Sequence, residues 1–509
     1  MAMTKPTSEQ VTFLQTGTGA TARTVDAKLK DTISVKDFGA IGDGVTDDTA
    51  AIQAAVTAVG IAGGCVLIPT GTYKITSAIN IPQVVAIKGQ CAERSIIRPY
   101  GCNGINFVIS NGIGPIAIED IFIYGSGCQT FSAIIAVGNS TTASKVTGLN
   151  INRVRVSDFK YAINWRGVWS STIKNCSFNN CIFGILLKGQ CVKISVENNT
   201  IIHNLLGTVT PAACGLTVES TFDYDPIPTE HRPEDIQLEE NLIYGFPIAV
   251  SLNNGLFISI NNNDLDAVGL TGIKFAALGG TLNITKNWIG LVGGATSVGI
   301  YAVPLAAVTA ITKNISENEI NSIATSAYGI NIQQNQHDVR ILNNTITNFT
   351  YDIYCQNNGG ALITGNRCNT VGGIGSIYIY NSFSPNTVTI ENNTCLGYVY
   401  CHPSANTAQI FIGANQGLAS TKILGKSTIL AATTTVTTTY ASLNSVPPNF
   451  GSLVNTGMLQ KLFIQTPLVN IGSIFGTAGP AQVTITCSVA PAADTIIYWE
   501  VISVATITP

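Results

Sequence analysis

The sequence predicts an all-β fold, a right-handed parallel β-helix solenoid, from a repeated unit and from the strand that follows it. The six-residue unit Ile-x-x-Asn-x-Ile recurs between residues 196 and 395 at intervals of 22 to 42 residues, which suits one solenoid coil. A second short strand follows each unit, usually opening with glycine and alternating apolar with variable residues. The fourth-place asparagines are Asn199, Asn241, Asn263, Asn287, Asn318, Asn344, Asn366 and Asn393.

These asparagines have two expected roles. Asparagine tolerates the left-handed backbone that a tight bend requires, and stacked amides can hydrogen-bond the coils on either side. We therefore expect each fourth-place residue to form the bend itself and to belong to an internal ladder. Helical repeats are the rival solenoid, but segments rich in Asn, Thr and Ile and poor in Leu, Glu and Lys disfavour helix.

Composition narrows the classes of partner. Charged residues make up 11% of the 509 residues, and the net charge of −3 gives no electrostatic reason to expect nucleic acid. No apolar run approaches the roughly 20 residues of a spanning helix, so membrane insertion is not expected. The 13 cysteines include no C-x-x-C pair, so we expect free, mostly buried thiols and neither a metal site nor a cofactor. Cys355, Cys368, Cys395 and Cys401 fall at inward positions of the repeat.

The first 80 residues divide into two predicted segments. Residues 1–33 are expected to be a neck or attachment segment, either a frayed terminus or a short helix around Val25 and Leu29 that associates with its own copies. In residues 34–80, Thr46, Asp47 and Asp48 are typical of a helix N-terminus. The helix that follows has one apolar face and is expected to cap the open end of the solenoid. That face comprises Ile52, Ala55, Val56 and Val59.

Two stretches in this region carry a family resemblance. They are S-V-K-D-F-G-A-I-G-D-G-V-T-D-D-T-A-A-I-Q-A-A-V (34–56) and G-G-C-V-L-I-P-T-G-T-Y (63–73). Together they resemble the start of the pectate-lyase-like β-helix domain of bacteriophage tailspike proteins, and the coil pattern extends the resemblance loosely to residue 412. In that family the motif marks the fold, so Asp43, Asp47 and Asp48 are not expected to be catalytic.

The resemblance implies a biological setting. It predicts a homotrimer made in the host cytoplasm and carried on the virion, joined to the phage tail or baseplate through its N-terminus. Such a protein binds, and usually cleaves, a bacterial surface polysaccharide such as capsule or O-antigen. Residues 81–415 are then the β-helix with the substrate groove. The Thr/Ser/Val-rich residues 416–509 are expected to form a small β-rich domain for trimerisation or glycan binding.

Outward residues of the glycine-led strands predict where a sugar chain binds. Registering each coil on its inward residue, Ile248 and Ile273 among them, yields two outward columns repeating at about 4.8 Å. The first column includes Ala249, Lys274 and a run of tyrosines; the second includes Glu219 and Ser251. Tyrosine rings, amides and charged groups suit an extended oligosaccharide, although strands favour tyrosine in any case. The predicted substrate-binding residues are Arg166, Lys188, His231, Arg232, Glu240, Lys274, Tyr301, Tyr354 and Tyr378.

Acidic residues concentrate around one coil with a long insertion, residues 219–235. Glycoside hydrolysis needs two carboxyl groups, and the first candidates are Glu219 with Asp223 or Asp225, followed by Asp264 and Asp266. Glu219 can instead form a surface ion pair with Lys188.

Two other functions stay open. A polysaccharide lyase would use cations and a base drawn from Arg166, Lys188, Lys274, His231, Arg232 and Tyr301. A non-catalytic receptor-binding spike would use the tyrosines alone and leave the acidic loop as solvated surface.

Overall fold

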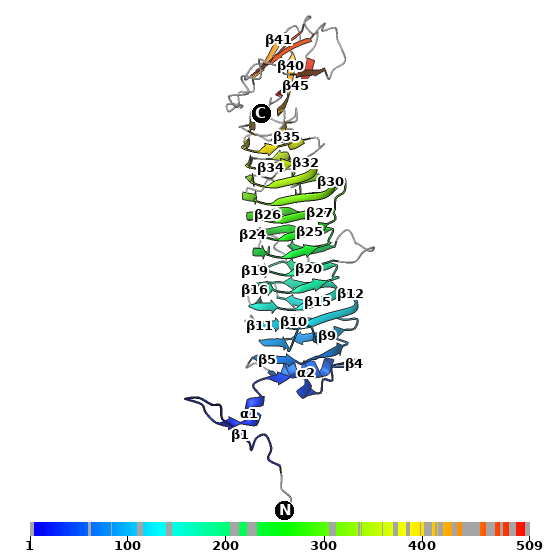
Figure 1. Ribbon diagram of the computed structural model, residues 1–509, viewed down its shortest axis with the longest axis vertical. Coiled ribbons are helices and arrows are strands. Elements are labelled where there is room, and N and C mark those ends of the chain that lie inside the picture. Colours follow the sequence, from blue (N-terminus) through cyan, green and yellow to red (C-terminus); the bar gives the residue numbers. More distant parts are fainter. Residues whose placement is uncertain are drawn as a thin grey trace, which may run out of the picture. The chain divides into compact units, whose positions relative to one another are not determined.

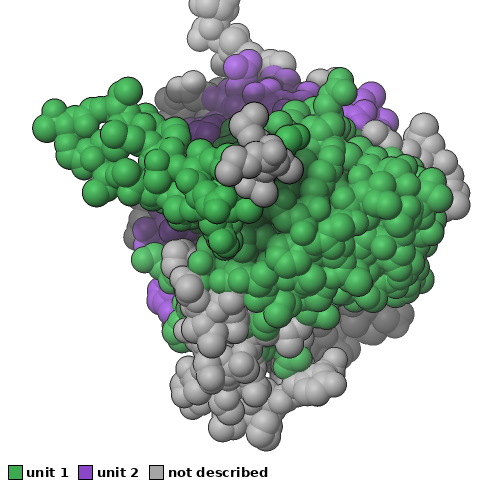
Figure 2. All heavy atoms as spheres, turned by 90° about the horizontal axis from the view of Figure 1, so that it is seen from below, with its two compact units in different colours: residues 1–205, 221–231 green, residues 206–220, 232–509 purple. Residues whose placement is uncertain are grey.

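The computed structural model divides the chain into two compact units, coloured separately in Figure 2. Unit 1 comprises Met1–Leu205 and Thr221–His231, and unit 2 comprises Leu206–Ser220 and Arg232–Pro509. The structure describes residues 5–59, 63–82, 84–108, 116–138, 145–203, 213–220, 232–304, 312–333, 336, 338–358, 360–369, 375–382, 387–397, 399–401, 410–412, 415, 421–429, 435–439, 459–464, 474–478, 482–487 and 495–503.

Each unit is wound as a parallel β-helix, as predicted (Figure 1). The strand pairings form three parallel stacks. We call the three stacks of strands the first, second and third sheets. In each coil, the strand just before the ladder residue belongs to the first sheet, the strand just after it to the second, and the next strand to the third. Some strands bend and serve two sheets. β26 (Thr271–Thr285), for example, pairs in parallel with β28 (Val298–Ala302) through its first half and with β29 (Thr312–Ser316) through its second.

The strands of unit 1 fall into the three sheets as follows. The first sheet contains β3 (Ile33–Ser34), β5 (Gly64–Ile68), β8 (Val85–Gly89), β11 (Ile116–Glu119), β14 (Leu149–Asn152), β16 (Val168–Lys174) and β19 (Val192–Glu197). The second contains β4 (Asp43–Asp47), β6 (Gly71–Ile75), β9 (Ser95–Pro99), β17 (Ser177–Asn179), β20 (Thr200–Ile202) and the first parts of β12 (Phe122–Val137) and β15 (Arg155–Arg166). The third contains β7 (Ile79–Ile81), β10 (Ile105–Val108), β18 (Phe183–Lys188) and the second parts of β12 and β15.

Unit 2 repeats this arrangement. Its first sheet contains β22 (Glu234–Glu239), β29, β31 (Val339–Leu342), β33 (Ala361–Thr364), β36 (Val388–Glu391), β39 (Ile410–Ile412) and the second halves of β24 (Ile248–Asn261) and β26. Its second contains β23 (Leu242–Tyr244), β25 (Asp264–Val268), β27 (Trp288–Leu291), β34 (Arg367–Asn369), β37 (Thr394–Cys395) and the first parts of β30 (Glu319–Ile332) and β32 (Thr345–Asn358). Its third contains β21 (Cys214–Glu219), β28, β35 (Gly375–Ser382), β38 (Val399–Cys401) and the remaining parts of β24, β26, β30 and β32.

Elements at the two ends of the chain differ from the coils. β1 (Thr12–Phe13) and β2 (Arg23–Thr24) form an antiparallel pair, and α1 (Val25–Leu29) and the 3₁₀ helix η1 (Val35–Phe38) follow. Near the C-terminus, β40 (Thr421–Ile429) and β42 (Leu459–Ile464) pair antiparallel with β45 (Thr495–Ser503). β41 (Thr435–Thr439), β44 (Gln482–Cys487) and β43 (Ile474–Ala478) form a separate antiparallel sheet. The roles of both ends stay predictions.

A stack of apolar residues fills the interior of each coil. In the third sheet of unit 2, Val250, Ile273, Ile300, Ile330, Ile353 and Ile377 occupy one level after another and are buried. Burying each such side chain stabilises the fold by about 1.5–3 kcal/mol.

One predicted registration is wrong by two residues. Val250, not Ile248, aligns with Ile273, so Ser251 rather than Ala249 shares the column of Lys274. Likewise Asn253, not Ser251, lies beside Glu219. This coil lacks a glycine at the start of its strand, so the sequence carried no marker for its register.

The asparagine ladder is confirmed. The backbone N–H of Asn263 donates to Oδ1 of Asn287 at 3.0 Å, and its Nδ2 donates to that same oxygen at 3.0 Å and to the carbonyl of Leu238 at 2.9 Å. The pattern continues to Asn415, one coil beyond the predicted run. Each buried amide thus satisfies polar groups of the coils on both sides.

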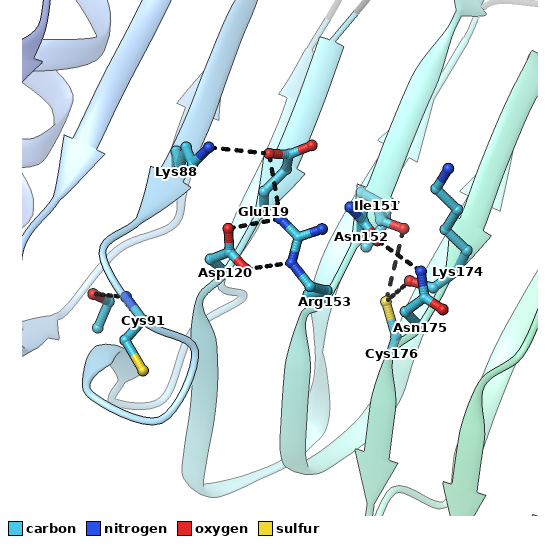
Figure 3. Close-up of polar contacts among 11 residues, drawn as sticks. Lys88, Cys91, Glu119, Asp120, Ile151, Asn152, Arg153, Lys174, Asn175 and Cys176 are labelled. Atoms are coloured by element: carbon cyan, nitrogen blue, oxygen red, sulfur yellow. Dashed lines mark hydrogen bonds and ion pairs between the residues drawn. The ribbon is translucent and has the colours of Figure 1, made fainter.

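The residue that makes the bend was predicted wrongly. The left-handed backbone belongs to the residue before each ladder asparagine, for example Glu240 (φ 55°), Lys286 (φ 57°) and Asn343 (φ 55°). The ladder side chain must point inward to reach its neighbours, so the preceding, outward residue takes the turn. In unit 1, Cys176 occupies the ladder position of an earlier coil, and its thiol donates to the carbonyl of Lys174 at 3.1 Å (Figure 3).

The acidic motif after residue 40 has a structural role. Asp48 is 1% exposed, and its carboxylate accepts the N–H groups of Ile41 at 2.7 Å and Gly42 at 3.1 Å. Asp47 accepts the N–H of Thr49, where helix α2 (Thr49–Val59) begins. The predicted apolar face of α2 is buried, and the helix contacts β5 and β7.

The cysteine prediction holds for the described thiols. The eleven whose side chains are described are free, and Cys355, Cys368 and Cys395 are buried; the side chain of Cys401 lies outside the described residues. Of the helices that the structure describes, none has the length and apolar character needed to cross a membrane.

Asn287→Ala tests the ladder. The substitution removes the acceptor of the N–H and Nδ2 groups of Asn263 and the donor to the carbonyl of Ile260. Leaving such buried groups unpaired should lower the free energy of unfolding by about 3 kcal/mol, measured by denaturant titration. The control is Asn283→Ala, at a half-buried outward position of β26; an equal loss in both variants would contradict a special role for the ladder.

Candidate functional site

Two candidate carboxylates lie side by side on the second sheet of unit 2. Asp264 and Asp266 are two positions apart on β25, so both face outward with about 6.6 Å between their backbone positions. The preceding coil places Leu242 and Tyr244 beside them, and the following coil places Trp288 beside Asp264. The structure therefore brings these two predicted acids together on one outer face.

The strand that carries the pair is irregular. The pairing of β25 with β27 shifts register between Leu265 and Val268, and Ala267 within this bulge has a left-handed backbone with φ 52°. For alanine that conformation costs roughly 1–2 kcal/mol. The N–H of Ala267 donates to Oδ1 of Asp266 at 2.6 Å, so the bulge orients this carboxylate.

The environment of Asp264 disfavours ionisation compared with a free carboxyl group. Partial burial of the carboxyl group and, second, the nearby charge of Asp266 raise the pKa of Asp264 above its ordinary value. A carboxyl group whose pKa is raised by burial and by a neighbouring carboxyl group is a candidate general acid.

An aromatic surface adjoins the pair. A Cβ added at Gly290 would meet the Trp288 ring at 2.3 Å and Oδ1 of Asp266 at 3.0 Å, so the indole and the carboxylate both border this glycine. The indole lies where a side chain of residue 290 would otherwise project. Such a platform beside a carboxylate suits the apolar face of a sugar ring.

Four tyrosines cluster on the third sheet of unit 2. Tyr354 stacks on Tyr378 with ring centroids 5.2 Å apart, and Tyr328 stacks on Tyr351 at 5.4 Å. The two stacks touch, because the Tyr328 and Tyr354 centroids are 5.1 Å apart. Within this cluster the rings therefore pack against one another.

The tyrosine hydroxyls are neutral donors. Burial, followed by the neighbouring tyrosines, raises the pKa of Tyr354 to about 12, and burial also raises the pKa of Tyr328 and of Tyr351. At neutral pH these groups therefore stay protonated and can donate hydrogen bonds.

The other predicted residues are more dispersed. Lys274 and Tyr301 are register neighbours on β26 and β28, and Glu240 is one of the left-handed turn residues. Glu219 ends β21 on the third sheet, so it does not join the β25 pair. Arg232 is half-buried, and its buried Nε has no hydrogen-bond partner in the described part of the chain.

Some predicted residues lie in unit 1 or outside the described residues. Arg166 and Lys188 are register neighbours in unit 1. Asp223, Asp225 and His231 fall outside the described residues. Within the described segments, no group of three or more His, Cys, Asp or Glu side chains could hold a metal ion.

Sequence reasoning missed Ala267, Trp288, Gly290, Tyr328 and Tyr351. Only the glycine-led strand was searched for outward residues, whereas Trp288 and Gly290 follow ladder residue Asn287 by one and three positions. The same alternation, applied to the short strand after each asparagine, would have found them. Tyr328 and Tyr351 each lie three residues before a predicted column position.

The fold is a parallel β-helix, and the comparisons with known proteins relate the chain to pectate-lyase-like proteins. The family model for rhamnogalacturonase A/epimerase, pectate lyase-like, matches residues 32–101. The tail spike protein of Shigella phage Sf6 is 29% identical over 282 residues, which cover 53% of this chain and 44% of that protein. The chain thus aligns with less than half the length of this curated relative.

Solved structures agree on the fold. The tailspike protein of E. coli bacteriophage HK620, in complex with a pentasaccharide, aligns over 97% of this chain and 98% of its own with a TM-score of 0.55 and 13% identity. The catalytic unit of a GH87 α-1,3-glucanase from Streptomyces thermodiastaticus covers 77% of this chain and 67% of its own, with a TM-score of 0.51 and 16% identity. The chain is a homologue of phage tail spike proteins with a pectate-lyase-like β-helix, as the motif at residues 34–73 predicted.

Gly290→Ala tests the contact between the indole and the carboxylate pair. The new Cβ overlaps the Trp288 ring, so the indole must move, with a shift in tryptophan fluorescence and a loss of about 1–3 kcal/mol in the free energy of unfolding. Gly269→Ala is the matched control, because a Cβ there meets its nearest heavy atom at 3.5 Å. Unchanged fluorescence in Gly290→Ala would show that the indole lies elsewhere.

Proposed function

We propose that this protein is a phage tailspike depolymerase that binds a bacterial surface polysaccharide, capsule or O-antigen, and hydrolyses its glycosidic bonds. The observation that carries the proposal is the pair of Asp264 and Asp266, oriented by a strained bulge and bordered by Trp288. Backbone strain persists only where surrounding structure supports it, and it concentrates at functional sites. The homology to tail spike proteins supports the choice of polymer.

In the proposed mechanism the two carboxyl groups take different roles. Asp264, whose pKa is raised above its ordinary value, donates a proton to the glycosidic oxygen as the bond breaks. Asp266, held by the N–H of Ala267, acts as base for an attacking water or as nucleophile at the anomeric carbon. In glycosidases, carboxyl groups roughly 5 Å apart retain the configuration of the anomeric carbon, and those about 6.5–9.5 Å apart invert it. Two side chains on the same face of one strand, such as those of Asp264 and Asp266, can be separated by a distance in the range of about 5–9.5 Å.

The tyrosine cluster extends the proposed binding surface. Tyr354 lies on the third coil after that of Asp264, a rise of about 14 Å, and Tyr378 lies one coil further. Lys274 lies on the same coil as Asp264, and Tyr301 lies on the next coil. A polysaccharide of several sugar units can span this distance, with its hydroxyl groups meeting tyrosine hydroxyls and side-chain amides.

The assembly proposed here is a homotrimer joined to the phage tail through residues 1–33. In that segment Leu14 and Leu29 are 61% and 66% exposed, and apolar side chains this exposed favour contact with another chain. Residues 416–509 are proposed as the trimerisation or glycan-binding part.

A lyase is the second candidate function. Lys274 and Tyr301 lie next to each other on the third sheet and could supply the cation and the base for β-elimination from a uronate. The products discriminate, because a lyase leaves an unsaturated uronate that absorbs in the ultraviolet and a hydrolase leaves only a new reducing end.

Single amide substitutions test the hydrolytic site. Asp264→Asn and Asp266→Asn should each lower the rate of polymer cleavage by about 10²- to 10⁴-fold and leave polymer binding intact, because each removes one proton-transfer or nucleophilic group but little contact area. The measurements are reducing-end release and equilibrium binding on a panel of capsular and O-antigen polysaccharides.

Glu219→Gln is the comparison variant, since Glu219 lies on another sheet. Loss of cleavage in Glu219→Gln alone would move catalysis to Glu219 with Asp223 or Asp225. Tight binding without cleavage by the unmodified protein would instead favour the receptor-binding spike.

A further inference from the structure

A cluster of cations and aromatic rings lies on the second sheet of unit 1, which carries none of the described candidate site residues. Lys74 on β6 and Arg98 on β9 are register neighbours, and Tyr124 continues the same outward column on β12. Tyr100 follows β9 directly and is 40% exposed.

Aromatic rings hold the Arg98 guanidinium. Its Cζ lies 5.1 Å from the centroid of Tyr100 and 5.5 Å from that of Tyr124, and Nζ of Lys74 lies 5.1 Å from the same Tyr100 ring. Cation–π contacts of this kind contribute about 0.5–1 kcal/mol each at exposed sites. They also restrict the guanidinium plane, so the entropy lost when it binds a ligand is smaller.

In the part of the chain that the structure describes, Arg98 lacks a carboxylate partner, whereas Lys74 has the carboxylate of Asp47 beside it on the neighbouring strand. Among the described residues, neither Lys74 nor Arg98 forms an ion pair within 4.0 Å, and the buried Nε of Arg98 has no hydrogen-bond partner. The acid next in the column, Asp47, accepts hydrogen bonds from Thr49 and Thr76.

Two arginines on nearby coils of unit 1 are paired. Arg153 donates to Asp120 through Nε at 2.6 Å and Nη2 at 2.8 Å, and Glu119 lies between Arg153 and Lys88 (Figure 3). Arg155 stacks on Phe122 much as Arg98 stacks on its tyrosines, but it also pairs with Glu93.

Lys74 and Arg98 carry like charges on adjacent strands, and Asp47 lies on the side of Lys74 away from Arg98. Cross-strand neighbours of the same sign lower stability by roughly 0.2–1 kcal/mol, and an anion between them would reverse that effect. Space for a ligand exists nearby, since a Cβ added at Gly101 or Gly127, next to Tyr100 and close after Tyr124 in the chain, would meet no heavy atom within 4 Å.

We propose that Arg98 and Lys74, stacked on Tyr100 and Tyr124, bind an anionic substituent, a carboxylate or a phosphate, of the saccharide. The planar guanidinium would hold two oxygens of the anion and the ammonium would neutralise its charge. This inference rests on the proposed function in one respect, that the ligand is a saccharide. It does not require that the protein cleaves the saccharide. The site is therefore tested by binding alone.

The experiment measures binding of hexagalacturonate and maltohexaose, a carboxylated and a neutral probe of equal length, to the full chain by calorimetry. We expect tighter binding of hexagalacturonate, weakened by salt. Arg98→Gln should lower its affinity about tenfold, the effect of losing a charge-assisted hydrogen bond, and Arg98→Lys should lower it less. Thermal unfolding of each variant checks that it is folded.

Arg153→Gln is the matched control, because it removes one positive charge from the same unit where that charge is already paired. It should leave affinity unchanged. An equal loss in Arg153→Gln, no loss in Arg98→Gln, or no preference for hexagalacturonate over maltohexaose would overturn the site. Displacement of hexagalacturonate by inorganic phosphate but not by acetate would assign the site to phosphate-bearing saccharides, and the reverse would assign it to carboxylates. Absence of cleavage with these binding results intact would count against the proposed hydrolase only.

Discussion

The hydrogen-bonded asparagine ladder is the interaction on which the arrangement of unit 2 depends. Each amide of the ladder bonds the coil before it and the coil after it, so one residue sets the register of three successive coils. A slip of one residue would turn every inward isoleucine outward and every outward side chain inward. The spacing of Asp264, Trp288 and the tyrosines along the outer faces is therefore a consequence of a buried polar contact.

The candidate site lies where the repeat is irregular. β25 is the strand in which Ala267 takes a left-handed backbone, and the resulting bulge supplies the N–H that holds Asp266. A regular strand would leave Asp266 without this donor. The indole of Trp288 covers Gly290. The absence of a side chain at residue 290 leaves the space that the aromatic ring occupies. Sites that break a local rule in an otherwise consistent fold are often functional.

Much of the fold could be predicted from the sequence, because a β-helix repeats one sequence pattern and every coil shows the same inward and outward positions. The asparagines, the inward isoleucines and the cap helix face were all readable from periodicity. Details that depend on three-dimensional geometry were not. The left-handed bend lies one residue earlier than predicted, at Glu240 and its equivalents, because Asn241 must point inward. The register of the strand at Val250 differs from the prediction by two residues, because no glycine marks the start of that strand.

The candidate site was only partly predictable for the same reason. Asp264 and Asp266 were recognisable as acids with an i, i+2 spacing, but the bulge that orients them and the glycine that admits Trp288 leave no local signal. The tyrosine column was recognised, whereas the mutual stacking of Tyr354 and Tyr378 emerges only when coils are superposed. In unit 1, paired and unpaired arginines look alike in sequence and differ only in which carboxylates the coils bring near them.

The central claim is that the outer face formed by Asp264, Asp266 and Trp288 holds the bond to be cleaved. A crystal structure of Asp264→Asn with an oligosaccharide of the cleaved polymer tests it most directly. The account predicts a sugar ring on the indole of Trp288, with the glycosidic oxygen near residue 264 and the anomeric carbon facing the Asp266 carboxylate. An oligosaccharide whose scissile linkage lies at Glu219, with Asp266 and Trp288 exposed only to solvent, would contradict it.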